Sequence, residues 1–294
     1  MREYQYLEFR AIDKPLDREA MRDLRAITTR AEITPTSLVN EYHFGSFKGE
    51  PVELMKQYFD AFFYFGSWGS HELMLRFPLG ALDLSQVQPY CCEYTLDVHT
   101  TPTHLILEFH AEEDDSADRF EGNDDDVSLD SVIGIRNDLI AGDLRALYIA
   151  WLSAAQCDDP NSDELEPPVP GGLGNLTSTL ESFAAFMRVD ALLLEVAAEA
   201  SEPEMYLKGT PEDYGLWLGR KSAEEKDSWL VRLLDGAGPL LRNELLQQFR
   251  VDQALARGEI IVPETTGQRT VGDLLQAQAK LAASRRRQTT GNRK

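Results

Sequence analysis

Cysteines and long apolar runs are scarce in this 294-residue chain, and each shortage excludes a class of protein. Its three cysteines are the adjacent Cys91 and Cys92 and the distant Cys157, which cannot build the disulfide framework of a small secreted domain. No apolar run approaches the ~18–20 residues that cross a bilayer. Arg2 and Glu3 place charge where an export signal would be apolar. We therefore expect a soluble, cytoplasmic protein without a membrane partner.

Positive charge is also scarce, because 29 Lys and Arg stand against 50 Asp and Glu, giving a net charge of −21. Binding to the nucleic acid backbone depends largely on Lys and Arg, so broad nucleic-acid binding is not expected. The negative charge is concentrated in residues 111–130, which contain ten acidic residues and one basic residue. Residues 284–294 form a basic tail, predicted to be disordered, that could contact an acidic or nucleic-acid partner.

These two charged segments contain the candidate interaction residues. Like-charge blocks are typical of solvated, mobile chain, and they also occur in segments that dock onto a partner of opposite charge. On the second interpretation the acidic segment selects a protein partner with a basic surface, or the basic tail of this chain. The candidate interaction residues are Glu112, Glu113, Asp114, Asp115, Asp124, Asp125, Asp126, Arg285, Arg286 and Arg287.

Hydrophobic residues make up 43% of the chain, which is enough for a substantial core. Alternating apolar and polar residues predict strands at 4–12, 33–44 and 71–78. Helical spacing predicts one helix after Asp17 and a second, from Pro51 to about residue 64, whose apolar stripe includes Phe59, Phe62 and Phe63. This order predicts an α+β fold, in which a mixed N-terminal β-sheet is layered with two helices.

Residues 93–110 predict a β-hairpin around the loop 100–103. An antiparallel register pairs His99 with His104 and Glu93 with His110. Because side chains alternate between the two faces of a strand, this register has an apolar face and a polar face. The apolar face contains Tyr94, Leu96, Val98, Leu105, Leu107 and Phe109, and the polar face contains Glu93, Asp97, His99, His104 and His110.

The chain after the acidic segment is predicted to be helical, and it completes the expected fold with an all-α C-terminal domain. The region rich in Pro, Gly and acidic residues at 158–174 has no periodicity and is typical of a linker or long loop. The predicted division is a sheet domain (1–110), an acidic loop (111–130), a helical connector (131–157), a linker (158–174), a helical domain (175–283) and a basic disordered tail (284–294).

All five histidines lie in the first 110 residues, and three of them occupy the polar face of the predicted hairpin. Imidazole nitrogen with carboxylate oxygen is a common ligand set for zinc and related divalent metals. His99, His104 and Asp97 are therefore the candidate metal ligands, and Glu108 or His110 is a candidate general base. The alternative is a solvated polar face. Cys91 and Cys92 lack the C-x2-C spacing of a zinc site and are predicted to be small buried hydrophobes.

The chain contains no G-x-S-x-G, H-E-x-x-H or phosphate-binding glycine motif. Gly45 to Gly49 is a short loop that could cradle an anion, although a plain connection is the simpler interpretation. Two functions remain open. The preferred one is a non-enzymatic interaction or adaptor module, one component of a larger cytoplasmic assembly, without a cofactor. The alternative is a metal-dependent hydrolase or nuclease-like enzyme that uses the hairpin histidines.

Overall fold

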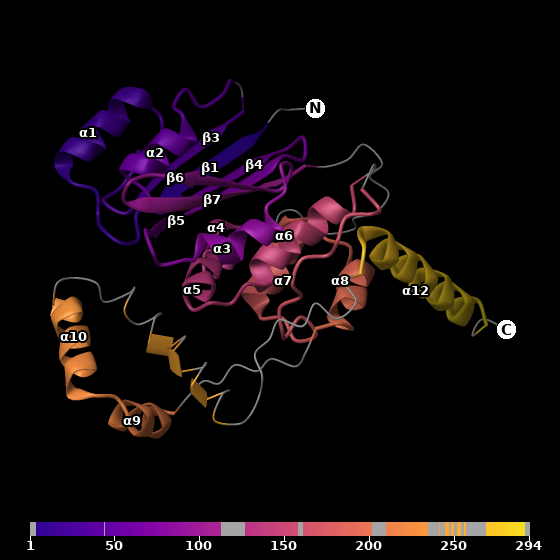
Figure 1. Ribbon diagram of the computed structural model, residues 1–294. Coiled ribbons are helices and arrows are strands. Elements are labelled where there is room, and N and C mark those ends of the chain that lie inside the picture. The colour runs from indigo at the N-terminus through magenta and orange to yellow at the C-terminus, as the bar shows by residue number, and fades with distance from the viewer. Residues whose placement is uncertain are drawn as a thin grey trace.

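Seven strands form one antiparallel sheet in the computed structural model (Figure 1), in the order β2-β3-β1-β4-β5-β7-β6. The structure describes residues 4–43, 45–112, 127–157, 161–201, 210–234 and 269–291, with isolated residues between 241 and 256. The predicted α+β class is confirmed, but every pair of neighbouring strands is antiparallel, so the sheet is not mixed. The strands are β1 (Gln5–Arg10), β2 (Glu32–Ile33), β3 (Ser37–Tyr42), β4 (Ala61–Gly66), β5 (His71–Pro78), β6 (Leu96–Thr100) and β7 (His104–Ala111).

Helices cover both faces of this sheet (Figure 1). The described helices are α1 (Arg18–Ile27), α2 (Pro51–Gln57), α3 (Leu84–Val87), η1 (Gln88–Tyr90), α4 (Leu129–Val132), α5 (Ile135–Ile140), α6 (Arg145–Ala155), α7 (Ser178–Phe186), α8 (Ala191–Ala198), α9 (Pro211–Gly219), α10 (Ala223–Leu234) and α12 (Val271–Gly291). On one face α1 and α2 cover a cluster around Phe9, Phe62 and Ile106. On the other, α3 to α8 join a larger cluster that includes Leu107 and Phe109.

The helix predicted from Pro51 to about residue 64 ends at Gln57, and its second half is strand β4. Asp60 explains the change, because it is fully buried and holds the start of the strand. Its carboxylate accepts hydrogen bonds from the main-chain N–H of Ile12 (2.6 Å) and from Nη2 of Arg76 (2.7 Å). In β4, Phe62 faces the α1/α2 cluster and Phe63 faces the opposite cluster. Phe62 and Phe63, which fit one helical stripe in the sequence, therefore pack into two different hydrophobic clusters on opposite faces of the sheet.

The predicted hairpin is present as β6 and β7, but its register is shifted by two residues, so that His99 lies opposite Ile106. The turn is tighter than expected because the hydroxyl of Thr101 accepts hydrogen bonds from the N–H groups of Thr103 (3.3 Å) and His104 (2.8 Å). A shift of two residues keeps the side chains within β6 and β7 on their predicted faces. Glu93 and Tyr94 precede β6 and lie in a turn, where Tyr94 is 74% exposed.

The helical region and the sheet share one hydrophobic core, which extends from β5 and β7 to α8 and α12. The predicted linker is held against α6 and the start of the last helix by Glu166. This buried carboxylate pairs with Arg269 (2.7 Å) and accepts a hydrogen bond from the hydroxyl of Tyr148. The C-terminal tail was expected to be disordered, but α12 continues through Arg285 to Gly291 and packs against α8. Residues of the sheet, the connector and the last helix therefore stabilise one another.

Helices α9 and α10 lie apart from the sheet (Figure 1). Trp217 of α9 is buried, stacks on Trp229 of α10 at a ring distance of 5.9 Å, and donates a hydrogen bond to Asp252 (2.8 Å). No residue of α10 is buried among the described residues. This pair therefore has a small aromatic centre of its own.

Candidate functional site

Five polar side chains lie close together on one face of the sheet, near the start of β5 and β6 and the end of β7. This is the face that carries Met74 and Ile106 of the α1/α2 cluster. Alternation along each strand places them there, because Glu72 lies opposite His110 and Asp97 lies opposite Glu108 in the ladders. His99 lies on the same face of β6, two residues after Asp97. We call Glu72, Asp97, His99, Glu108 and His110 the carboxylate–imidazole cluster.

Glu108 is the centre of the carboxylate–imidazole cluster and is 9% exposed. One carboxylate oxygen, Oε2, contacts Nε2 of His99 in a short hydrogen bond. The other, Oε1, lies 3.5 Å from Nε2 of His110, which lies 3.7 Å from Oδ2 of Asp97. Each imidazole is therefore next to at least one carboxylate, an arrangement that fixes the orientation of the ring and can hold or release a proton.

Glu72 is the most perturbed member of the carboxylate–imidazole cluster. Its Oε1 atom is buried and has no hydrogen-bond partner among the described residues. Burial, the charge of the neighbouring Glu108 and a side-chain hydrogen bond with Glu108 together raise the pKa of Glu72 to about 8. Across the strand pair, Tyr64 has a pKa raised to about 12 by burial and by the charge of Glu72. The two glutamates are thus too close to ionise together without a compensating charge.

Three members of the cluster can contribute to one metal site. Glu72, Glu108 and His110 each offer a ligand atom, and these atoms lie within 4.8 Å of one another. Two carboxylate oxygens and one imidazole nitrogen suit zinc, manganese or iron. The buried, unpartnered oxygen of Glu72 fits such an ion, because a cation would satisfy that oxygen and offset the repulsion between the two glutamates.

The structure brings together two of the three metal ligands predicted from the sequence. Asp97 and His99 belong to the carboxylate–imidazole cluster, but His104 does not. His104 lies four residues before Glu108, about 13 Å along the strand, and its Nδ1 atom pairs with the hydroxyl of Thr103 (2.8 Å). Burial, with the positive charge of Arg76, lowers the pKa of His104. The second imidazole of the cluster is instead His110, which was predicted as a candidate general base.

Glu72 was missed as a site residue, although the strand that carries it was predicted correctly. Its alternation in β5 showed which side of the strand it occupies. Nothing in the sequence showed that β5 would pair with β7, which places Glu72 opposite His110. Alternation in the sequence shows that Glu72 is at a polar position, but it does not show which residue lies beside it on the neighbouring strand.

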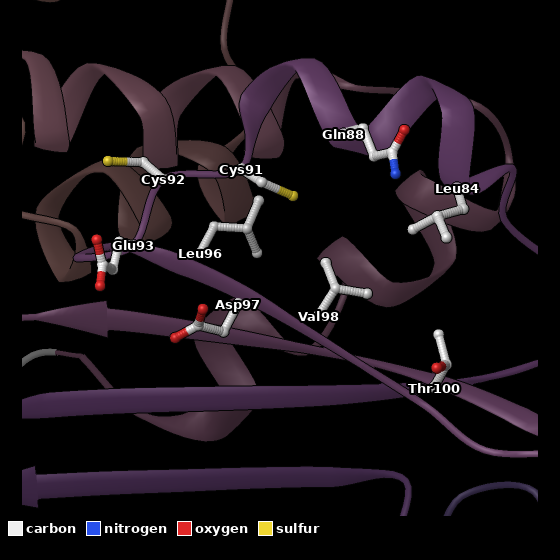
Figure 2. Close-up of a pocket in the computed structure, with 9 residues that line it drawn as sticks. All are labelled: Leu84, Gln88, Cys91, Cys92, Glu93, Leu96, Asp97, Val98 and Thr100. Carbon is white, nitrogen blue, oxygen red and sulfur yellow. The ribbon is translucent and has the colours of Figure 1, made fainter.

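Cys91 and Cys92 were predicted to be buried, but Cys91 is exposed and Cys92 is partly exposed. Both lie beside a groove between α3–η1 and β6, where their sulfur atoms point away from each other (Figure 2). Burial of the thiol and the nearby charge of Asp97 raise the pKa of Cys91. A raised pKa leaves this thiol protonated at neutral pH in the absence of a metal.

The predicted interaction residues fall in different parts of the chain. Glu112 is exposed at the end of β7. Arg285 of α12 pairs with Glu195 of α8 at 2.5 Å, and Arg286 and Arg287 lie on the same helix. The other predicted acidic residues lie outside the described residues: Glu113, Asp114, Asp115, Asp124, Asp125 and Asp126.

No family model, curated protein or solved structure matches this chain. Among the described helices, none is both long enough and apolar enough to span a membrane. The geometry of the carboxylate–imidazole cluster is therefore the basis for the function proposed below.

Proposed function

We propose that this protein is a metal-dependent hydrolase whose divalent ion is held by Glu72, Glu108 and His110. The observation that supports this proposal is the buried Oε1 atom of Glu72, which lacks a hydrogen-bond partner among the described residues and lies beside a second carboxylate. A buried carboxylate pair of this kind is costly without a proton or a cation between its members. A bound divalent ion supplies Lewis-acid chemistry to water or to a substrate carbonyl or phosphoryl group.

The chain's own residues would orient the ligands and move a proton. Glu108 accepts a hydrogen bond from Nε2 of His99, which makes His99 the candidate proton carrier beside the site. Asp97 lies 3.7 Å from His110 and favours one orientation of that imidazole. The net charge of −21 disfavours a polynucleotide substrate, so a neutral or cationic substrate is the better match.

Metal titration of the purified full chain tests this proposal. After treatment with a chelator, Zn²⁺ and Mn²⁺ are titrated by isothermal calorimetry, and bound metal is counted by elemental analysis. We expect one ion per chain, with affinity reduced at least tenfold in Glu72→Gln. His104→Ala is the matched control, because it removes an imidazole from the same strand outside the cluster, and it should bind metal normally.

Hydrolysis of p-nitrophenyl acetate, a neutral ester, should then require the added metal, and it should fall in His99→Ala at unchanged metal content. The absence of stoichiometric metal, or equal metal affinity in Glu72→Gln, would refute the proposal.

A second candidate function is protein interaction, which is favoured by the surface of α10. Leu230, Val231, Leu233 and Leu234 are each more than half exposed, and apolar exposure on one helix is typical of protein contact sites. Together with the acidic segment, α10 would belong to an adaptor that binds basic partners in a cytoplasmic assembly. The three free cysteines are compatible with a reducing compartment. Quantitative affinity capture from lysate should lose the same partners on deletion of residues 111–130, and an unchanged set would exclude this function for the segment.

A further inference from the structure

The two edge strands of the sheet differ in length, and no described strand pairs with the outer side of either. The sheet begins at β2, which has two residues, and ends at β6, which has five. Edge strands present unpaired main-chain N–H and C=O groups, which another extended chain can pair with. Proline and lysine are two of the residues that protect such edges in other proteins, and β6 (Leu-Asp-Val-His-Thr) contains neither.

The register shows which groups of β6 face outward. The main-chain N–H of His110 donates to the C=O of Thr95 (3.0 Å), and the N–H of Leu96 donates away from β7 to the C=O of Cys92 (3.0 Å). Because hydrogen-bonding direction alternates along a strand, Asp97 and His99 point their main-chain groups at β7. Val98 and Thr100 therefore point theirs away from the sheet.

A groove lies along this outward side, between β6 and the α3–η1 segment (Figure 2). Its volume is about 380 Å³. Leu84 of α3 and Val98 of β6 give it apolar walls, and Glu93 and Asp97 are exposed carboxylates on its lining. No basic residue lines the groove among the described residues. A ligand that matches it is extended, carries free main-chain groups and has positive charge.

We propose that the groove binds an extended, basic peptide segment of a partner protein, which adds to the sheet as a strand beside β6. Main-chain hydrogen bonds to Val98 and Thr100 would supply affinity, and Glu93 and Asp97 would select lysine or arginine side chains. This site uses the edge of the sheet and shares only Asp97 with the carboxylate–imidazole cluster. Asp97 is not one of the three proposed metal ligands, so strand addition does not depend on the metal proposed above.

A pair of synthetic peptides tests the main-chain contacts. The first probe is fluorescein-labelled acetyl-Lys-Val-Lys-Val-Lys-Val-amide, and the second is the same peptide with every backbone nitrogen methylated. We expect fluorescence anisotropy to show saturable binding of the first peptide to the full chain. Methylation should weaken binding at least tenfold, because it removes the N–H groups that strand addition needs. A Glu-Val-Glu-Val-Glu-Val peptide should bind at least tenfold more weakly than the lysine peptide.

Two variants at one position test the edge itself. Val98→Pro removes an N–H that faces away from β7, so the hairpin ladder keeps its hydrogen bonds. Val98→Thr is the matched control, because it has a similar shape and keeps the N–H. We expect Val98→Pro to lose at least tenfold in peptide affinity and Val98→Thr to change by less than threefold, with circular dichroism melting to show that both are folded. Glu93→Gln should weaken binding of the lysine peptide about threefold and raise its salt tolerance.

Several results would overturn the proposal. These are the absence of saturable binding of the lysine peptide, equal binding of the methylated peptide, or amide NMR shifts on peptide addition that avoid Val98 and Thr100. Analytical ultracentrifugation of the chain alone tests whether a second copy of the chain occupies this edge. A dimer that dissociates in Val98→Pro would show that a second copy, and not a basic peptide, pairs with this edge.

Discussion

Glu72 carries a proton at neutral pH, because burial and Glu108 raise its pKa to about 8. In the unfolded chain its pKa would return to about 4.3. The folded state therefore holds an extra proton between these values, and the stability that this proton contributes is present at pH 4 and lost as the pH rises through 8.

We predict that the metal-free protein loses roughly 4 kcal/mol of unfolding free energy between pH 5 and pH 8.5 because of Glu72. The Glu72→Gln variant, which cannot ionise, should lack this part of the pH dependence and be the more stable protein at pH 8.5. Urea denaturation at four pH values in the presence of a chelator measures the difference. Parallel pH profiles for the two proteins would contradict the predicted pKa shift.

The same proton predicts how metal affinity depends on pH. Carboxylate ligands must be ionised, so metal binding displaces the proton from Glu72. Between pH 6 and 7.5 the apparent affinity for Mn²⁺ should rise about tenfold per pH unit and then level off above pH 8. Calorimetry in buffers of different ionisation enthalpy should count about one released proton at pH 7. Affinity that is independent of pH would place the ion elsewhere.

At the scale of elements, the pair formed by Asp60 and Arg76 joins four parts of the chain. Asp60 accepts from the N–H groups of Ile12 and Asp13 (2.6 and 2.9 Å), and Nη1 of Arg76 donates to the C=O of Met55 (2.9 Å). The Asp60 side chain is 1% exposed. The pair therefore fixes the end of α2 and the start of β4 to β1 and β5.

We predict that Asp60→Ala lowers the unfolding free energy by roughly 3–5 kcal/mol, because it removes the anionic partner of a buried guanidinium and the acceptor of two main-chain N–H groups. The matched control is Glu53→Ala, which removes the exposed ion pair with Lys56 (2.7 Å) and should cost less than about 0.5 kcal/mol. Urea denaturation measures both values. Equal losses would show that the buried pair is not the contact that holds these elements together.

Elements with a local signal were predicted well from the sequence. Asp17 accepts from the N–H groups of Glu19 and Ala20 (3.0 and 2.8 Å) and begins α1 where expected. The hairpin faces were also correct, because alternation survives a register shift of two residues. The helix predicted through Phe62 was wrong, since the buried contact between Asp60 and Arg76 has no local pattern. The metal site was only partly predicted for the same reason, because Glu72 meets His110 through a long-range strand pair.

At the scale of the whole molecule, one core joins the sheet to the helices that follow it in the chain. Phe183 of α7 is fully buried and makes an edge-to-face contact with Phe109 of β7 at a ring distance of 5.2 Å. Its neighbour Phe186 stacks at 5.9 Å and also contacts Phe63 of β4 (5.7 Å). Packing of this kind couples residues that are far apart in sequence.

We predict that Phe183→Ala costs roughly 3–5 kcal/mol and lowers the stability of sheet and helices together. Hydrogen exchange should show the same loss of protection in β7 and in α6, because both belong to the shared core. The amides of α10, which has no buried residue among those described, should exchange faster and be unchanged by the substitution. Loss of protection confined to α7 would mean that the two layers unfold independently.

The unequal edges of the sheet limit how far this protein can associate. A filament of stacked sheets needs a template at both ends of each copy. In the part of the chain that the structure describes, β2 is two residues long and offers almost no template. If a second copy paired with β6 in place of a peptide, only the two short β2 strands would remain at the outer edges of the joined sheet. Association through β6 would then end at two chains and could not extend into a fibril.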